Sequence, residues 1–187
     1  MKRHLTAQLL FTVVGSAVHA LAGTPAVNAD SAIIQDFQKR VDDYLQLRKK
    51  AEAALPAQKA TASPAKITHQ QNELARAIRR GRANAKQGDI FTPPIAMEIR
   101  RLLTMAMGTA DAPAVRQSLQ SAEPVQLHLN VGETYPDRLP LQSTPPTLLA
   151  NLPKLPPEIE YRITGQDLVL LDTKANLIVD VIHGVFS

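Results

Sequence analysis

The sequence predicts an α+β fold, with an N-terminal helical hairpin and a third helix followed by a small antiparallel β-meander. Two patterns lead to this prediction. Before residue 108, apolar residues recur every three or four positions, which is the spacing of one face of a helix. After residue 123, apolar and polar residues alternate, as in a half-buried strand. We therefore expect a helical region at 30–122 and a proline-rich connection with the meander at 123–187.

Residues 1–29 have the composition of a secretory signal peptide. Lys2 and Arg3 precede an apolar run from Leu5 to about Ala22, and the small residues Val27 and Ala29 stand at −3 and −1 of a cleavage site. The alternative is an uncleaved membrane anchor, but polar residues interrupt the run, and a spanning helix needs about 20 apolar residues. We expect cleavage near Ala29, a periplasmic or secreted protein, and no stable membrane span afterwards.

The first predicted helix runs from Ser31 to about Ala54, before Pro56, and the second from about Pro64 to Lys86, before Gly88. Each has one stripe of core-facing positions, so the two should pack as an antiparallel hairpin. The stripes consist of Ile34, Phe37, Val41, Tyr44, Leu45 and Arg48 in the first helix, and of Ile67, Gln71, Leu74, Ile78 and Ala85 in the second.

A third helix is predicted from Pro93 to about Met107. Thr92 can cap it, and a proline in the first turn lacks only an N–H that would have no partner. Gly108 closes it, and its core-facing residues are Ile95, Ile99, Leu102 and Leu103. A short helical turn at 112–120 can follow.

The β region begins with alternation at Val125–Val131. A short helix is expected near Thr147–Asn151, within the proline-rich passage. Three strands then follow, at Ile159–Thr164, Leu168–Asp172 and Leu177–Ile182. The turns between them are short, which requires antiparallel hairpins. The second of these strands is apolar on both faces, so it should be the central one.

The C-terminal sixty residues resemble a module of small secreted proteobacterial proteins, including the RcnB-like family linked to periplasmic nickel and cobalt homeostasis. The residues that carry this resemblance are Val131-Gly132-Glu133, Pro136, Leu152-Pro153, Leu155-Pro156-Pro157, Tyr161-Arg162-Ile163, Asp167–Asp172 and Ile178–Ile182. The first two-thirds of the chain looks like an uncharacterised group of exported bacterial proteins, and residues 85–93 carry this second resemblance. The resemblance implies export and a terminal β-meander, and it raises metal chemistry as a hypothesis.

The sequence contains no pattern that predicts catalysis or a cofactor. It has no cysteine, no G-x-S-x-G elbow and no glycine-rich phosphate loop. The absence of cysteine also excludes a lipoprotein anchor and disulfides. Carboxylates are paired at Glu158 and Glu160, which we interpret as a solvated sheet edge, and at Asp172 and Asp180. We assign no catalytic residue and expect a protein that is not an enzyme.

Three histidines follow the predicted cleavage site: His69, His128 and His183. No two have the spacing of a local chelate, and a metal needs convergent ligands. His128 and His183 could still converge if their strands pair, whereas separate surface histidines are the default. We assign no metal site.

Charge is divided unevenly between the two halves. Residues 36–101 contain fourteen Lys or Arg and seven Asp or Glu, whereas residues 102–187 contain five and nine. The outer face of the second helix is a candidate contact for an anionic lipid or lipopolysaccharide surface. The alternative is an ordinary solvated face. Nucleic acid is not expected, since aromatic residues are not interleaved with the cations. The residues predicted to contact the anionic lipid or lipopolysaccharide surface are Arg76, Arg79, Arg80, Arg82 and Lys86.

A protein of the cell envelope is the other candidate partner. Phe186, near the end of the last strand, could anchor such a partner or fold back onto the core. Taken together, the patterns predict an exported, non-enzymatic binding or structural protein of unknown ligand. The alternative hypothesis is an accessory protein in periplasmic nickel or cobalt homeostasis.

Overall fold

The structure, a computed structural model, describes residues 29–57, 61–108, 128–136 and 145–186, with residues 113 and 117. The predicted signal peptide, apart from Ala29, and most of the helical turn expected at 112–120 lie outside these residues. The described elements are α1 (Ala29–Ala53), α2 (Pro64–Gly81), α3 (Pro93–Met107), α5 (Pro146–Leu149), β1 (Ile159–Thr164), β2 (Asp167–Asp172) and β3 (Leu177–Ile182). This is the α+β class that the sequence predicts.

The three strands form an antiparallel sheet in the order β1-β2-β3, which confirms the β-meander and the central place of β2. Tyr161 pairs with Leu170, and Val169 pairs with Val181. The register of β2 and β3 shifts between Leu170 and Leu171, as at a β-bulge. In the turn between these two strands, Asn176 has a φ of 48°, a left-handed conformation that asparagine tolerates.

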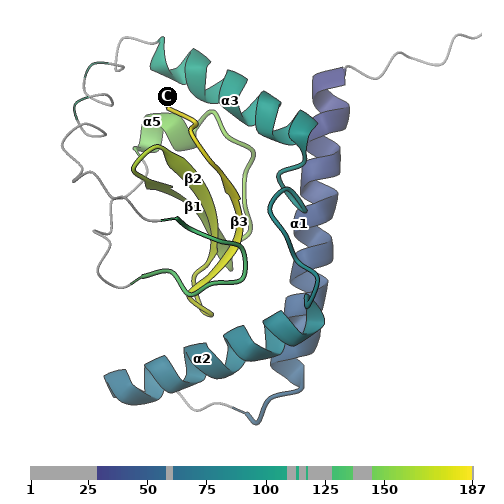
Figure 1. The fold of residues 1–187 in the computed structure, drawn as a ribbon, viewed down its shortest axis with the longest axis vertical. Helices are drawn as coiled ribbons and strands as arrows, with labels where there is room; N and C mark the ends of the chain where they lie inside the picture. Colours follow the sequence, from purple (N-terminus) through teal and green to yellow (C-terminus); the bar gives the residue numbers. More distant parts are fainter. Residues whose placement is uncertain are drawn as a thin grey trace, which may run out of the picture.

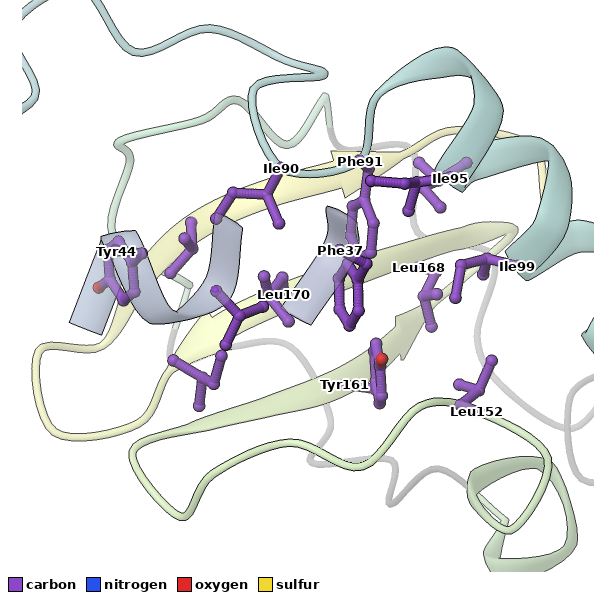
Figure 2. Packing of buried hydrophobic residues seen from close by; sticks show 14 of the residues in the cluster. Phe37, Tyr44, Ile90, Phe91, Ile95, Ile99, Leu152, Tyr161, Leu168 and Leu170 are labelled. Atoms are coloured by element: carbon purple, nitrogen blue, oxygen red, sulfur yellow. The ribbon is translucent and has the colours of Figure 1, made fainter. Parts of the chain in front are cut away.

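The helices surround the sheet on three sides (Figure 1) and bury one of its faces. Figure 2 shows how side chains from α1, α3 and the strands interlock. Phe37 of α1 stacks on Phe91 with ring centroids 5.8 Å apart and on Tyr161 of β1 at 6.5 Å. The helical and β regions therefore share one core, in which Leu168 and Leu170 are fully buried.

The second helix ends earlier than predicted, at Gly81 instead of near Lys86. Its predicted stripe is correct at Leu74 and Ile78, which are buried, but wrong at Ile67, which is 40% exposed. The reason is visible in Figure 1: α2 crosses one end of α1 and does not run along its length, so the first turns of α2 extend away from the core. At the crossing, a Cβ on Gly81 would lie 3.2 Å from Leu47, so the glycine permits close approach.

The third helix has its predicted bounds, and its core-facing residues are buried or partly buried as expected. Thr92 occupies the N-cap position but its side chain forms no capping hydrogen bond, so the predicted cap is wrong in this detail. The short α5, Pro146–Leu149, overlaps the predicted range 147–151 but begins one residue before it. Phe186 is partly buried against the core, as the core-sealing alternative predicts.

The strand predicted at Val125–Val131 is not formed in its described part, residues 128–131. Gly132 has a φ of 83° and sits in a turn that ends the alternation. The segment nevertheless pairs with β3 through single contacts: the Gly132 N–H donates to the Ile178 carbonyl, and the Ile178 N–H donates to the Glu133 carbonyl. Leu129 and Tyr135 join a second buried cluster, which includes residues of β2 and β3.

Candidate functional site

The five basic residues predicted to contact an anionic surface have two different roles in the structure. Arg79 and Arg82 fasten α2 and the turn after it to the β region. The Arg79 guanidinium donates to the Gly132 carbonyl and, at 3.0 Å, to the Thr134 hydroxyl. The Arg82 guanidinium donates to the Val179 carbonyl at 3.1 Å. These two side chains therefore hold the fold together and are not available as a free anion-binding surface.

Arg82 also has two contacts within the helical region. Its guanidinium carbon lies 5.3 Å from the centroid of the Tyr44 ring, a cation–π arrangement, and its Nη2 lies 3.8 Å from Asp89. The arginine thus joins α1, the loop before α3 and β3. The sequence pattern counted Arg82 as a residue of the outer helix face, whereas the end of α2 at Gly81 places it in a turn.

The remaining three cations, Arg76, Arg80 and Lys86, are exposed. Arg76 forms an ion pair with Glu73 one turn earlier, and its side chain stays 61% exposed. Glu73 is the only acidic residue of α2, whose sequence contains four cations: Lys66, Arg76, Arg79 and Arg80. The outward side of α2 therefore keeps an excess of positive charge after folding.

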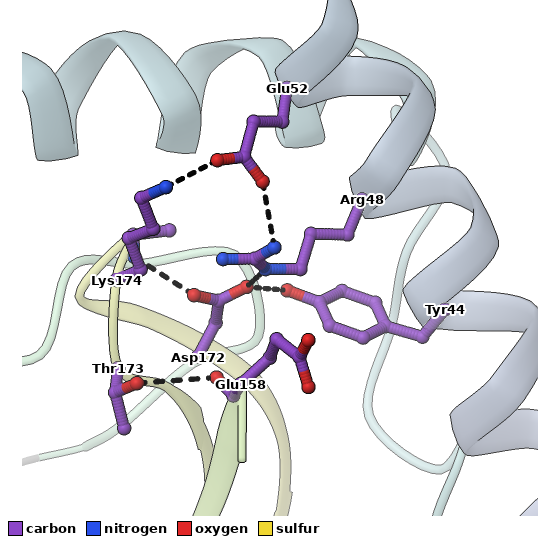
Figure 3. A network of polar contacts seen from close by, with 8 residues as sticks. Tyr44, Arg48, Glu52, Glu158, Asp172, Thr173 and Lys174 are labelled. Carbon is purple, nitrogen blue, oxygen red and sulfur yellow. Dashed lines mark hydrogen bonds and ion pairs between the residues drawn. The ribbon is translucent and has the colours of Figure 1, made fainter. Parts of the chain in front are cut away.

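A buried polar network joins α1 to the turn between β2 and β3 (Figure 3). Asp172 is 0% exposed, and its Oδ2 accepts hydrogen bonds from the Tyr44 hydroxyl at 2.8 Å and from Arg48 Nε at 2.6 Å. Its Oδ1 accepts the Ala175 N–H at 2.8 Å. Arg48 also donates to Glu52 at 3.0 Å. Buried charges are tolerated only when they are paired and hydrogen-bonded, and this network meets that condition.

The network holds its groups in fixed protonation states. Burial, with the adjacent negative charge of Asp172, raises the pKa of Tyr44 far above its ordinary value. Burial alone would lower the pKa of Arg48, but the charge and hydrogen bond of Asp172, together with Glu52 and Tyr44, outweigh that effect and raise it. A hydrogen bond from Lys174, together with Arg48, lowers the pKa of Glu52. Such groups do not exchange protons near neutral pH, so the arrangement is suited to structure more than to acid–base chemistry.

A second buried carboxylate, Asp180 of β3, accepts four backbone N–H groups. Its Oδ2 accepts from Ile90 and Phe91, each at 2.8 Å, and its Oδ1 accepts from Gly88 at 3.0 Å and from Val181 at 2.8 Å. Asp180 thereby orders the loop that leads into α3. Sequence analysis noted Asp172 and Asp180 only as a carboxylate pair. The signal that could identify Asp180 is its position inside the apolar run Leu177–Ile182.

The histidines do not form a metal centre with other ligands in the part of the chain that the structure describes. No group of three metal-ligating side chains occurs there. His128 is exposed, and His183 Nδ1 lies 2.8 Å from Asp167 Oδ2. A carboxylate on Nδ1 fixes the tautomer that leaves Nε2 as a ligand, which is the usual setting of a metal-binding histidine.

A pocket of about 410 Å³ lies at the edge of the sheet beside β1. One wall is β1, and the other is the segment that follows α5. Its lining is mainly apolar, with two cations and one carboxylate among the residues. The lining residues are Leu149, Pro153, Lys154, Leu155, Ile159, Glu160, Tyr161 and Arg162. No part of this pocket was predicted, because its walls meet only in the folded chain.

Comparison with protein families, with curated proteins and with solved structures finds no significant match to this chain. The resemblance to the RcnB-like module therefore stays a prediction from the quoted residues. Among the described helices, none is long and apolar enough to cross a membrane.

Proposed function

We propose that this chain is an exported binding protein, not an enzyme, and that it contacts an anionic surface of the cell envelope through α2 and the turn after it. The contact residues are Arg76, Arg80 and Lys86. The observation that supports this proposal is the division of the basic residues. Arg79 is hydrogen-bonded to the segment before α5 and Arg82 to β3, whereas these three are exposed to solvent. The proposal of export rests on the composition of residues 1–29.

The exposed cations of α1 make a useful contrast. Lys39 pairs with Asp43 at 2.6 Å, and Arg40 pairs with Asp36 at 3.0 Å. Over its whole length α1 contains five acidic and five basic residues, so its charge is balanced. On α2, Glu73 is the only carboxylate beside three exposed cations, Lys66, Arg76 and Arg80, so the electrostatic attraction to a phosphate-rich surface is concentrated there.

Vesicle flotation tests the proposal. The protein should float with vesicles that contain phosphatidylglycerol and not with pure phosphatidylcholine, and binding should weaken as salt is added. The triple variant R76Q/R80Q/K86Q should lose most of this binding. The matched control K39Q/K49Q/K50Q removes three charges from α1 and should retain it. Equal losses in the two variants would show that only net charge matters, and the assignment to α2 would then be dropped.

The alternative function, an accessory role in metal homeostasis, is favoured by one observation, the pairing of His183 with Asp167. Its test is thermal unfolding in the presence of Ni²⁺, Co²⁺ or Zn²⁺. A rise in melting temperature that H183Q abolishes supports it. An unchanged melting temperature with all three metals removes it.

A further inference from the structure

The pocket beside β1 is shaped by contacts that require no ligand. The Tyr161 hydroxyl donates to the Pro153 carbonyl at 3.1 Å and so fixes the second wall to the strand. Leu148 and Leu152, which flank the exposed Leu149, are buried in the core. Prolines at 153, 156 and 157 restrict the backbone of this wall. The fold itself therefore fixes the position of the second wall relative to β1.

The lining of the pocket favours an apolar ligand. Leu149 is 41% exposed and is one of four large apolar side chains with such exposure in the described residues. It lies beside Leu155, Pro153 and Ile159 at the same concavity. Covering these surfaces would remove apolar area from water, at about 25 cal/mol per Å².

The charged residues of the pocket favour an anionic group at its rim. Arg162 is half-buried and forms an ion pair with Glu160, so these two charges offset each other. Lys154 is exposed, and no ion pair engages it among the described residues. The lining therefore carries one uncompensated positive charge next to an apolar surface.

We infer that this pocket binds a single-chain fatty acid, with the alkyl chain against Leu149 and Leu155 and the carboxylate beside Lys154. A volume of 410 Å³ is at the lower end of the range of about 300–1,000 Å³ for small-molecule sites, which suits one chain better than two. The site is separate from the proposed contact on α2, because α5 lies beside α3 at the opposite end of the molecule (Figure 1).

Isothermal titration calorimetry with dodecanoate, below its micelle concentration, tests the inference on the purified chain. Dodecyltrimethylammonium, with the same chain and the opposite charge, is the comparison ligand. The variant K154E should weaken dodecanoate binding about fivefold and strengthen that of the cation. The variant L149Q should weaken both by about fivefold. Both positions are exposed, so each variant should keep the parent melting temperature.

The control K66E makes the same charge change on α2, where Lys66 is exposed and remote from the pocket. It should bind dodecanoate as the parent does. The inference is overturned if dodecanoate does not bind, if K66E weakens it as much as K154E, or if the two amphiphiles bind equally well. The calorimetric test uses monomeric dodecanoate and no vesicles. The variant R76Q/R80Q/K86Q should therefore bind dodecanoate as the parent does, even where it has lost vesicle binding.

Discussion

The Tyr44 hydroxyl donates a 2.8 Å hydrogen bond to Asp172 Oδ2 across 128 positions of sequence. One partner lies in the middle of α1, and the other ends β2. Arg48, one turn after Tyr44, donates to the same oxygen at 2.6 Å. A single carboxylate oxygen at the end of β2 therefore joins α1 to the sheet.

Replacing Asp172 by asparagine should lower the free energy of unfolding by about 3–5 kcal/mol. The amide has nearly the same shape, but it leaves the buried Arg48 without its main charge partner. Tyr44→Phe removes one hydrogen bond and should cost less, about 1–2 kcal/mol. Urea unfolding followed by circular dichroism measures both.

The control for this pair is Asp43→Asn on the exposed side of α1, where the effect should stay within about 0.5 kcal/mol. If Asp172→Asn were as harmless as Asp43→Asn, the buried network would not stabilise the fold.

The carboxylate of Asp180 should protect the backbone amides of the loop before α3 from hydrogen exchange. Asp180→Asn replaces one acceptor oxygen by a donor, which then faces N–H groups that have lost their partner. We expect a loss of about 2–3 kcal/mol and faster hydrogen exchange at the amides of Ile90 and Phe91. Amides in the β1–β2 ladder serve as the internal reference. Unchanged exchange at Ile90 and Phe91 would contradict the role given to Asp180.

Periodicity in the sequence was sufficient to predict the three strands and α3. In these elements the local spacing of apolar and polar residues determines the type of secondary structure. It failed at the end of α2. There the apolar spacing continues to Ala85, but the chain turns after Gly81 to bring Arg82 onto β3. A tertiary contact overrides the pattern at this point.

The candidate site was harder to predict than the fold. All five cations share a short stretch of sequence, but only tertiary structure separates Arg79 and Arg82, whose acceptors lie 53 and 97 positions away. In the sequence, Asp172 is an ordinary residue at the end of a predicted strand. No residue near it in sequence indicates its hydrogen bonds with Tyr44 and Arg48. The pocket beside β1 likewise has no local signature.

Two isoleucines of α2 provide a matched test of the crossing between α1 and α2. Ile78 is 0% exposed, whereas Ile67 is 40% exposed on the same helix. Ile78→Ala should cost about 2–5 kcal/mol, because it leaves a cavity in the core. Ile67→Ala should cost less than about 1 kcal/mol, and alanine's helix propensity offsets part of it. Similar losses, measured by urea unfolding, would mean that α2 packs along α1 as a regular hairpin.

Alkaline titration should reveal the buried tyrosines. Burial raises the pKa of both Tyr44 and Tyr161 far above the ordinary value of about 10. A raised pKa stabilises the folded state fully below pH 10, and this contribution falls as the pH rises further, because the unfolded chain then ionises first. Tyrosinate absorbance of these two residues should therefore appear together with unfolding. Their ionisation in a chain that stays folded would show that they are solvated.

The two roles of the basic residues can be separated by stability measurements. R79Q/R82Q removes hydrogen bonds to Gly132, Thr134 and Val179 and a cation–π contact, so the free energy of unfolding should fall by about 2 kcal/mol. R80Q/K86Q removes the same charge from exposed positions and should change it by less than about 0.5 kcal/mol. Urea unfolding at two salt concentrations checks both, since loss of buried contacts is less sensitive to screening than loss of surface charge. Equal destabilisation of the two variants would mean that Arg80 and Lys86 also form stabilising contacts within the fold. Arg76 alone would then remain as a proposed contact with the anionic surface.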